Sequence, residues 1–143
     1  MRNNILNLLP YTGKQIFSRL TFTFLIAAQS IAARNVEITQ FGAVGDAATL
    51  NTKALQMAID TCAETGGGEV TVPPGTYITG TIYLRSNVEL HLCRGSIIRG
   101  SYRNPEDYPT RSLIVADSIE NAGISGSGII DGNAQHPEFQ KNY

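Results

Sequence analysis

Apolar residues recur at helical spacing in one segment of the chain, residues 51–65. One face of this segment carries five apolar side chains, Ala54, Leu55, Ala58, Ile59 and Cys62. Asn51 is a favourable N-cap residue, and Gly66 can supply the left-handed conformation that ends many helices. The pattern therefore predicts one amphipathic helix, with these apolar side chains facing a core.

Short apolar and β-branched runs, separated by Gly, Asn or Ser, make up most of the chain after this helix. They predict strands over residues 69–72, 78–79, 81–84, 88–92, 96–98, 113–116, 122–125 and 129–131. The dipeptides typical of tight hairpins are absent between these strands, and Asp131-Gly132 alone has that form. Pro74 and Gly75 suit the centre of a type II turn, so we predict a tight reversal after the first strand.

An apolar stretch also precedes the helix. Phe41, Ala43 and Val44 predict a lead-in strand, which Gly42 and Gly45 would allow to bend. Helix and lead-in strand would together form one end of the fold.

The predicted strands are too short for most sandwiches and suit the sides of a coil. A helix ahead of them would cover the open end of a stacked core, as solenoids require. In such a coil Val88, Leu90 and Leu92 point inward, whereas Glu89 and His91 face outward. The sequence therefore predicts an all-β parallel β-helix, or β-solenoid, with an N-terminal capping α-helix.

Composition narrows the class of protein. The 143 residues suit one domain, and 42% hydrophobic with 16% charged residues excludes a disordered tail or a membrane bundle. A net charge of -1 without a Lys-rich block offers no surface for phosphate backbones, so nucleic acid is excluded as a partner.

The head of the chain predicts export. Residues 1–32 contain three basic residues and no acidic one, followed by an apolar run over residues 20–28 and the small-residue site Ser30-Ile31-Ala32. This order is typical of a secretory signal peptide, here residues 1–32, with residues 33–143 as the mature domain. The apolar run is shorter than the ~20 residues of a membrane span, so we predict no stable membrane anchor. The expected location is secreted or periplasmic.

The cysteines and histidines suggest no chemistry of their own. Cys62 continues the apolar face of the helix, whereas Cys93 points away from the face that Leu90 and Leu92 bury, which predicts no disulfide. Neither cysteine has His and Asp neighbours that indicate a nucleophile. His91 has no second ligand at fixed spacing, so the sequence gives no support for a metal site.

Five pieces in fixed order carry a family resemblance. They are F-G-A-V-G-D (41–46), N-T-K-A-L-Q-M-A-I-D (51–60), G-G-G-E-V-T-V-P-P-G-T-Y (66–77), T-G-T-I-Y-L-R-S-N-V-E-L-H-L (79–92) and S-G-S-G-I-I-D-G (125–132). Together they resemble the N-terminal part of family 28 glycoside hydrolases, the polygalacturonase relatives of the pectin lyase-like superfamily. The resemblance covers about residues 36–133 and implies a right-handed parallel β-helix.

The resemblance implies an activity that these residues cannot perform. It implies hydrolysis, with inversion, of the α-linked galacturonic acid backbone of pectin, an acidic plant cell-wall polysaccharide, by a monomer without a cofactor. An inverting hydrolase needs a carboxylic acid and a carboxylate ~6.5 to 9.5 Å apart. The family places such groups in Asn-Thr-Asp and Asp-Asp motifs, supported by His-Gly and Arg-Ile-Lys, and none of the four occurs here. We therefore expect a truncated N-terminal portion, inactive alone, and assign no catalytic, cofactor or metal residue.

Several residues remain as weaker candidates. Asp131 ends a strand near Asn133 and His136, but an ordinary Asp-Gly turn is the favoured interpretation. Two further groups could meet an acidic sugar chain: Arg85, Arg94, Arg99, Arg103, Arg111, and the tyrosines Tyr77, Tyr83, Tyr102, Tyr108. The arginines could instead be solvated strand edges, and Tyr77 and Tyr83 are expected to pack locally. The irregular loop over residues 100–110 is the first place to seek substrate contact.

Two rival functions stay open from the sequence. One is a polysaccharide lyase of the same superfamily, which removes a proton beside the carboxylate, commonly with calcium. The other is an adhesin-like β-helix that binds glycans without cleaving them. Paired acidic motifs beyond Tyr143 would favour the hydrolase.

Overall fold

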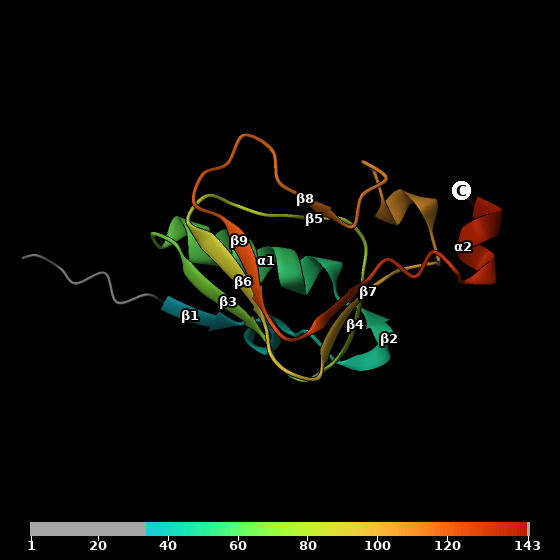
Figure 1. Ribbon diagram of the computed structural model, residues 1–143, viewed down its shortest axis with the longest axis horizontal. Helices are drawn as coiled ribbons and strands as arrows, with labels where there is room; N and C mark the ends of the chain where they lie inside the picture. Colours follow the sequence, from blue (N-terminus) through green and yellow to red (C-terminus); the bar gives the residue numbers. More distant parts are fainter. Residues whose placement is uncertain (1–33, 143) are drawn as a thin grey trace, which may run out of the picture.

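The computed structural model describes residues 34–142, which wind through four successive coils (Figure 1). The predicted signal peptide, residues 1–32, lies outside the described residues. The first coil contains β1 (Arg34–Glu37), the 3₁₀ helix η1 (Ile38–Phe41), β2 (Asp46–Leu50) and α1 (Thr52–Glu64). The second contains β3 (Gly68–Val72), β4 (Gly75–Thr79) and β5 (Ile82–Tyr83). The third contains β6 (Val88–Leu92), β7 (Ser96–Gly100), the 3₁₀ helix η2 (Pro105–Asp107) and β8 (Ile114–Val115). The fourth contains β9 (Gly123–Gly126), β10 (Ile129–Asp131) and α2 (Pro137–Asn142).

Successive coils add one strand to each face of the stack. One sheet has the order β1-β3-β6-β9, a second has β2-β4-β7-β10, and a third pairs β5 with β8. Every pairing is parallel. The predicted right-handed parallel β-helix is thereby confirmed.

Equivalent side chains stack in columns inside the coils. Leu90 lies beside Val70 of the coil before it and Ile124 of the coil after it. Val88, Leu90 and Leu92 are buried as predicted, while Glu89 is exposed and His91 half-buried. The period of two in strand β6 thus sets which side chains build the core.

Helix α1 covers the first end of this core, as predicted. Its buried face consists of Ala54, Leu55, Ala58, Ile59 and Cys62. These side chains join the strand residues in one hydrophobic cluster, and the helix packs against η1, β1, β3, β5 and β6. The helix ends as expected, because Gly66 adopts a positive φ of 102°.

Asn51 occupies the N-cap position but does not cap the helix through its side chain. Asn51 is the N-cap residue as predicted, but its side-chain amide bonds to backbone groups two and seven residues earlier in the chain. Asn51 is 2% exposed, its Oδ1 accepts from Val44 N at 2.7 Å, and its Nδ2 donates to the carbonyls of Val44 and Thr49. Its backbone N–H donates to the Ile78 carbonyl in the second coil. Asn51 therefore fastens the lead-in segment to the stack.

Two local predictions differ from the structure. Phe41 ends η1, and residues 42–45 form a turn and irregular chain and not a strand, with Val44 exposed. The chain also turns a corner after Val72 and does not reverse, because β3 and β4 belong to different sheets. Gly75 has a φ of 145°, far from the value of a type II turn, and it lies against Gly45, where a Cβ would meet the neighbouring Cα at 3.0 Å.

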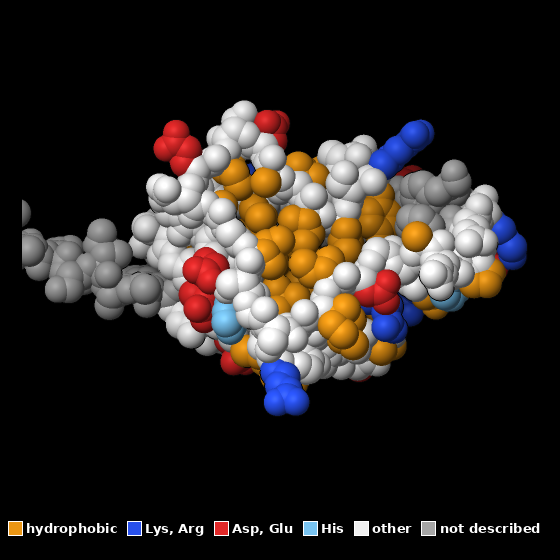
Figure 2. All heavy atoms as spheres, in the orientation of Figure 1, with side chains coloured by type: hydrophobic (Ala, Val, Ile, Leu, Met, Phe, Trp, Pro, Cys, Tyr) orange, Lys and Arg blue, Asp and Glu red, His pale blue; other side chains and the backbone are white. Residues whose placement is uncertain are grey.

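The fourth coil leaves apolar, inward-facing positions exposed. Ile124 and Ile130 are each 43% exposed, although Leu90 and Ile98, their partners in the third coil, are buried. Figure 2 shows hydrophobic side chains gathered in the middle of the face that this coil borders. The hydrophobic column therefore continues to the surface at this end of the stack.

Replacing Leu90 by Ala is expected to lower the free energy of unfolding by ~2 to 5 kcal/mol, because it removes buried methyl groups and leaves a cavity in the column. Ile129→Ala is the matched control, since Ile129 is 56% exposed. Denaturant unfolding measures both variants. Equal losses of unfolding free energy in the two variants would contradict the assignment of Leu90 to the core.

Asp46 closes a tight turn at the start of β2. Its Oδ1 accepts from the backbone N–H groups of Ala48 and Thr49 at 2.8 and 2.7 Å, and its Oδ2 accepts from Thr49 Oγ1 at 2.8 Å. These hydrogen bonds, the one from Thr49 N first, lower the pKa of Asp46 from 3.8 to about 2.

The stabilisation from ionised Asp46 should be present above pH 3.8 and lost as the pH falls towards 2, because the folded state binds this proton more weakly than the unfolded state. Asp46→Asn keeps an acceptor oxygen and removes the charge. We expect its unfolding free energy to fall less steeply than that of the unaltered chain between these pH values, with Glu120→Gln as an exposed control. Identical pH profiles for Asp46→Asn and the unaltered chain would contradict the proposed linkage.

Candidate functional site

A polar groove lies where the second sheet ends and the irregular loop of the third coil begins. Residues 131–135 line a hollow of about 430 Å³ directly after β10. The loop over residues 101–113, which includes η2, follows the neighbouring strand β7. We refer to residues 131–136 and this loop together as the strand-end site.

Asp131 is held by two hydrogen bonds at this site. Its Oδ2 accepts from Arg99 Nε at 2.9 Å, and its Oδ1 accepts from Asn133 N at 2.8 Å. Arg99 is the direct neighbour of Asp131 in the parallel register of β7 and β10. The carboxylate is therefore engaged in an ion pair and in its own turn, as in the Asp-Gly turn interpretation of the sequence.

Asn133 joins the turn to the coil below. It adopts a positive φ of 55°, which Asn tolerates better than most residues, and its Nδ2 donates to the Gly100 carbonyl at 3.0 Å. The backbones approach closely here, since a Cβ on Gly100 would lie 2.7 Å from the Gly132 carbonyl oxygen. Asn133 and Gly100 thus fix the distance between the two strand ends.

The four candidate tyrosines have different environments. The Tyr102 ring stacks on the His136 ring, with centroids 3.7 Å apart and planes inclined by 12°. Tyr108 is buried, and its hydroxyl donates to the carbonyls of Ser101 and Thr79. Tyr77 is buried, as expected, and Tyr83 is half-buried. Tyr102 and Tyr108 thus both belong to the strand-end site, and of these two tyrosines Tyr102 is the one that is not buried.

The arginines do not form one surface. Arg85 Nε donates to Asp60 Oδ1 of helix α1 at 2.7 Å. Arg85 follows β5, whereas the strand-end site follows β7 and β10. Arg94 lies at the corner between β6 and β7, and Arg103 and Arg111 are exposed in the loop. The described arginines of residues 85–111 therefore do not form a continuous basic groove, although Arg103 and Arg111 belong to the strand-end site and Arg99 contacts its Asp131.

Both cysteines are free thiols, which confirms the predicted absence of a disulfide between them. Burial raises the pKa of the Cys62 thiol, so this group is a poor nucleophile. Cys93 is half-buried. Across residues 34–142 we find no helix long and apolar enough to cross a lipid bilayer.

Sequence reasoning missed a second group of side chains. The parallel register of β3 and β6 brings Glu69 beside Glu89, with His91 two residues further along β6. Only the register between coils could have revealed this grouping, because the three residues have no metal-binding spacing in the sequence.

The strand-end site contains groups that can bind a polar ligand. Asp131 is paired with Arg99 and hydrogen bonded within its turn, so it is poorly placed to protonate a leaving group. Arg99, Arg103 and Tyr102 are groups that contact acidic or sugar ligands in general.

The chain is similar to proteins that act on polygalacturonate. A family described as rhamnogalacturonase A/epimerase, pectate lyase-like, matches residues 33–137. An exo-poly-alpha-D-galacturonosidase of Dickeya chrysanthemi is 39% identical over 119 residues, which cover 68% of this chain and 19% of that protein. A family 28 exopolygalacturonase of Yersinia enterocolitica is 40% identical, with a TM-score of 0.64 over 70% of this chain and 21% of that chain.

A further solved structure aligns over a larger share. A crystal structure described as a putative glycosyl hydrolase from Parabacteroides merdae has a TM-score of 0.71 and 33% identity, covering 76% of this chain and 48% of that chain. The chain spans about a fifth of the length of the curated relatives it matches.

Asp131→Asn is expected to lower the free energy of unfolding by no more than ~1 kcal/mol, because the Arg99–Asp131 pair is over a third exposed and solvent screens it. The substituted side chain can still accept from Asn133 N. Denaturant unfolding tests this, with Lys141→Gln, which breaks the exposed pair with Glu138, as the matched control. A loss well above that of the control would show that Asp131 has a larger structural role.

Proposed function

The chain belongs to the rhamnogalacturonase A/epimerase, pectate lyase-like family, and from this we propose that it is part of a glycoside hydrolase that cleaves the α-linked galacturonic acid backbone of pectin. The observation that carries the proposal is the 39% identity with an exo-poly-alpha-D-galacturonosidase across 68% of the chain. The likeness to a family 28 exopolygalacturonase, in sequence and in fold, supports the same substrate.

The proposed reaction inverts the anomeric carbon. One carboxylic acid protonates the leaving oxygen, and a carboxylate ~6.5 to 9.5 Å away activates water on the opposite face of the sugar. The chain lacks the motifs that provide these groups in the relatives it resembles. We therefore place them in coils that follow the fourth coil in the complete protein.

The exposed end of the stack supports this placement. Ile124 and Ile130 face the coil interior and are each 43% exposed, so a following coil would bury them. Adding a coil would also pair the free edges of β9 and β10. In this proposal the described residues are the first coils of a longer solenoid.

The strand-end site is the part of these coils that we propose to meet the polysaccharide. Arg103 is exposed in the loop and Tyr102 lies half-buried beside it, so a carboxylate and a sugar ring could be bound together. The proposal also includes export, through a signal peptide at residues 1–32, and action as a monomer outside the cytoplasm.

The test is an assay of polygalacturonate with two proteins: the 143-residue chain and the product of the same reading frame extended past Tyr143. The extended protein should release reducing ends of inverted configuration, and Asp→Asn changes in its acidic motifs should slow it by about 10² to 10⁴. The 143-residue chain should release none.

Product chemistry separates the rival activities. Unsaturated uronate ends, detected by ultraviolet absorbance, would identify a lyase and contradict the proposal. Retention of polygalacturonate without cleavage would identify a binding protein. Release of reducing ends by the 143-residue chain would show that the catalytic groups lie within the coils described above.

A further inference from the structure

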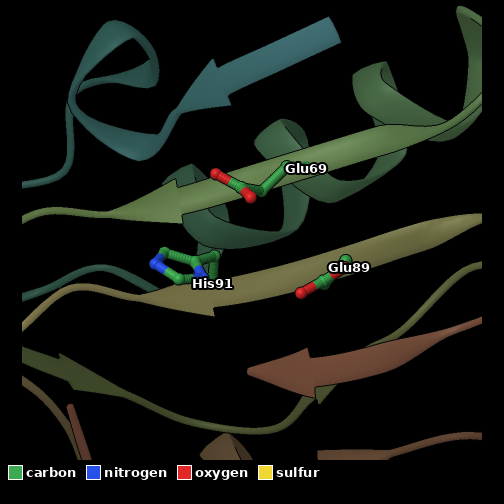
Figure 3. Close-up of side chains that lie close together, drawn as sticks. All are labelled: Glu69, Glu89 and His91. Atoms are coloured by element: carbon green, nitrogen blue, oxygen red, sulfur yellow. The ribbon is translucent and has the colours of Figure 1, made fainter. Parts of the chain in front are cut away.

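We propose that Glu69, Glu89 and His91 form a binding site for a divalent transition-metal ion of the zinc type on the outer face of the first sheet. Their ligand atoms, one from each residue, all lie within 4.8 Å of one another. Figure 3 shows Glu69 on β3 and the other two side chains on the neighbouring strand β6. This site lies away from the strand-end site, and its argument is independent of the activity proposed above.

The parallel register creates the cluster. Glu69 and Glu89 are direct partners in β3 and β6, and each adjoins an inward-facing core residue, Val70 or Leu90. Both carboxylates must therefore project outward on the same face of the sheet. His91 follows Glu89 by two residues and projects from this face as well.

Two carboxylates side by side on neighbouring strands repel each other. Neither takes part in the ion pairs found among the described side chains, which involve Arg85, Arg99 and Lys141. Among the side chains that the structure describes, no ion pair therefore joins a basic group to either carboxylate. A bound divalent cation would neutralise this pair of charges.

A hydrogen bond fixes the orientation of the His91 ring. Its Nδ1 lies 2.8 Å from Ser125 Oγ, on the adjacent strand β9. If Nδ1 carries the proton and donates it to Ser125, the lone pair of Nε2 is available to a metal. In that tautomer Ser125 would be the hydrogen-bond acceptor that a metal-ligating histidine commonly has.

The Glu69 carboxylate also has a hydrogen-bonding neighbour, Thr71, on its own strand. The Thr71 hydroxyl donates to Asn35 Oδ1 at 2.5 Å and also lies 3.0 Å from Glu69 Oε1, so its single proton is shared between these two oxygens. Glu69 and His91 are half-buried, whereas Glu89 is exposed and can adjust its rotamer. Two of the three ligands are therefore restrained, and the third can close on the ion.

The donor set selects the metal. One imidazole nitrogen with two carboxylate oxygens suits Zn²⁺, which binds such ligands at ~2.0 to 2.2 Å and keeps a fourth position for water. Ligand atoms around a tetrahedral Zn²⁺ are ~3.3 Å apart, so the side chains need to close by on the order of 1 to 2 Å. Ca²⁺ and Mg²⁺ prefer oxygen ligands alone, so imidazole disfavours them. A bound ion would join the second coil to the third.

Zinc binding is tested on the full 143-residue chain without an affinity tag, by competition with a chromogenic chelator and by thermal unfolding with and without Zn²⁺. We expect one ion per chain and a higher Tm in its presence. Glu89→Gln and His91→Ala should each weaken zinc affinity at least ~10-fold and remove most of the Tm increase. Circular dichroism verifies that both variants fold.

Glu37→Gln is the matched control. Glu37 lies on the same strand face, two residues beyond the register position of Glu69, but it is not a member of the cluster. This variant should bind zinc as the unaltered chain does. If Glu37→Gln lost as much zinc affinity as the cluster variants, zinc would be attracted by the acidic face as a whole. That result would contradict a specific site.

Two further outcomes would overturn the proposal. One is the absence of stoichiometric zinc binding. The other is equal or tighter binding of Ca²⁺ with the same dependence on Glu89, because it would mean that His91 is not a ligand. Zinc binding that depends on Glu89 and His91, with no polygalacturonate cleavage by any longer protein, would support the metal site while removing the proposed activity.

Discussion

In-register stacking of inward side chains along the coil axis is the constraint on which the rest of the structure depends. Val70, Leu90 and Ile124 occupy the same position in three successive coils, so each apolar side chain is covered by its equivalents. Parallel hydrogen bonding between neighbouring strands fixes this alignment, since a slip of one residue would turn every side chain to the other face. The same alignment places the outward side chains in rows, and this is how polar groups from distant parts of the sequence come together.

The spacing of apolar and polar residues was enough to predict the elements that depend on residues close together in the sequence. Strand β6 has the predicted bounds because its apolar and polar residues alternate, and helix α1 lies within one residue of the prediction at each end. Corners were not predictable in this way. The Pro-Pro-Gly sequence is compatible with a reversal or a change of sheet, and only the pairing of β3 with β6 in place of β4 decides between them.

Long-range partners explain what the sequence did not reveal about the polar residues. Asn51 was identifiable as the helix N-cap, whereas the hydrogen bond from its backbone N–H to the Ile78 carbonyl depends on the packing of the second coil. Asp131 was identifiable as a strand-end acid, whereas its partner Arg99 follows from the stacking of β10 on β7. The grouping of Glu69 with His91 has the same origin, because the number of residues in a coil determines which outward positions become neighbours.

Helix α1 makes the two ends of the stack different. It covers the interior of the first coil, whereas the fourth coil leaves Ile124 and Ile130 exposed. These exposed positions lie at the end towards which the chain runs, so the stack has one covered and one open end. A further turn of the same path would cover the open end, and a β-helix of this kind can therefore vary in length while its covered end stays the same.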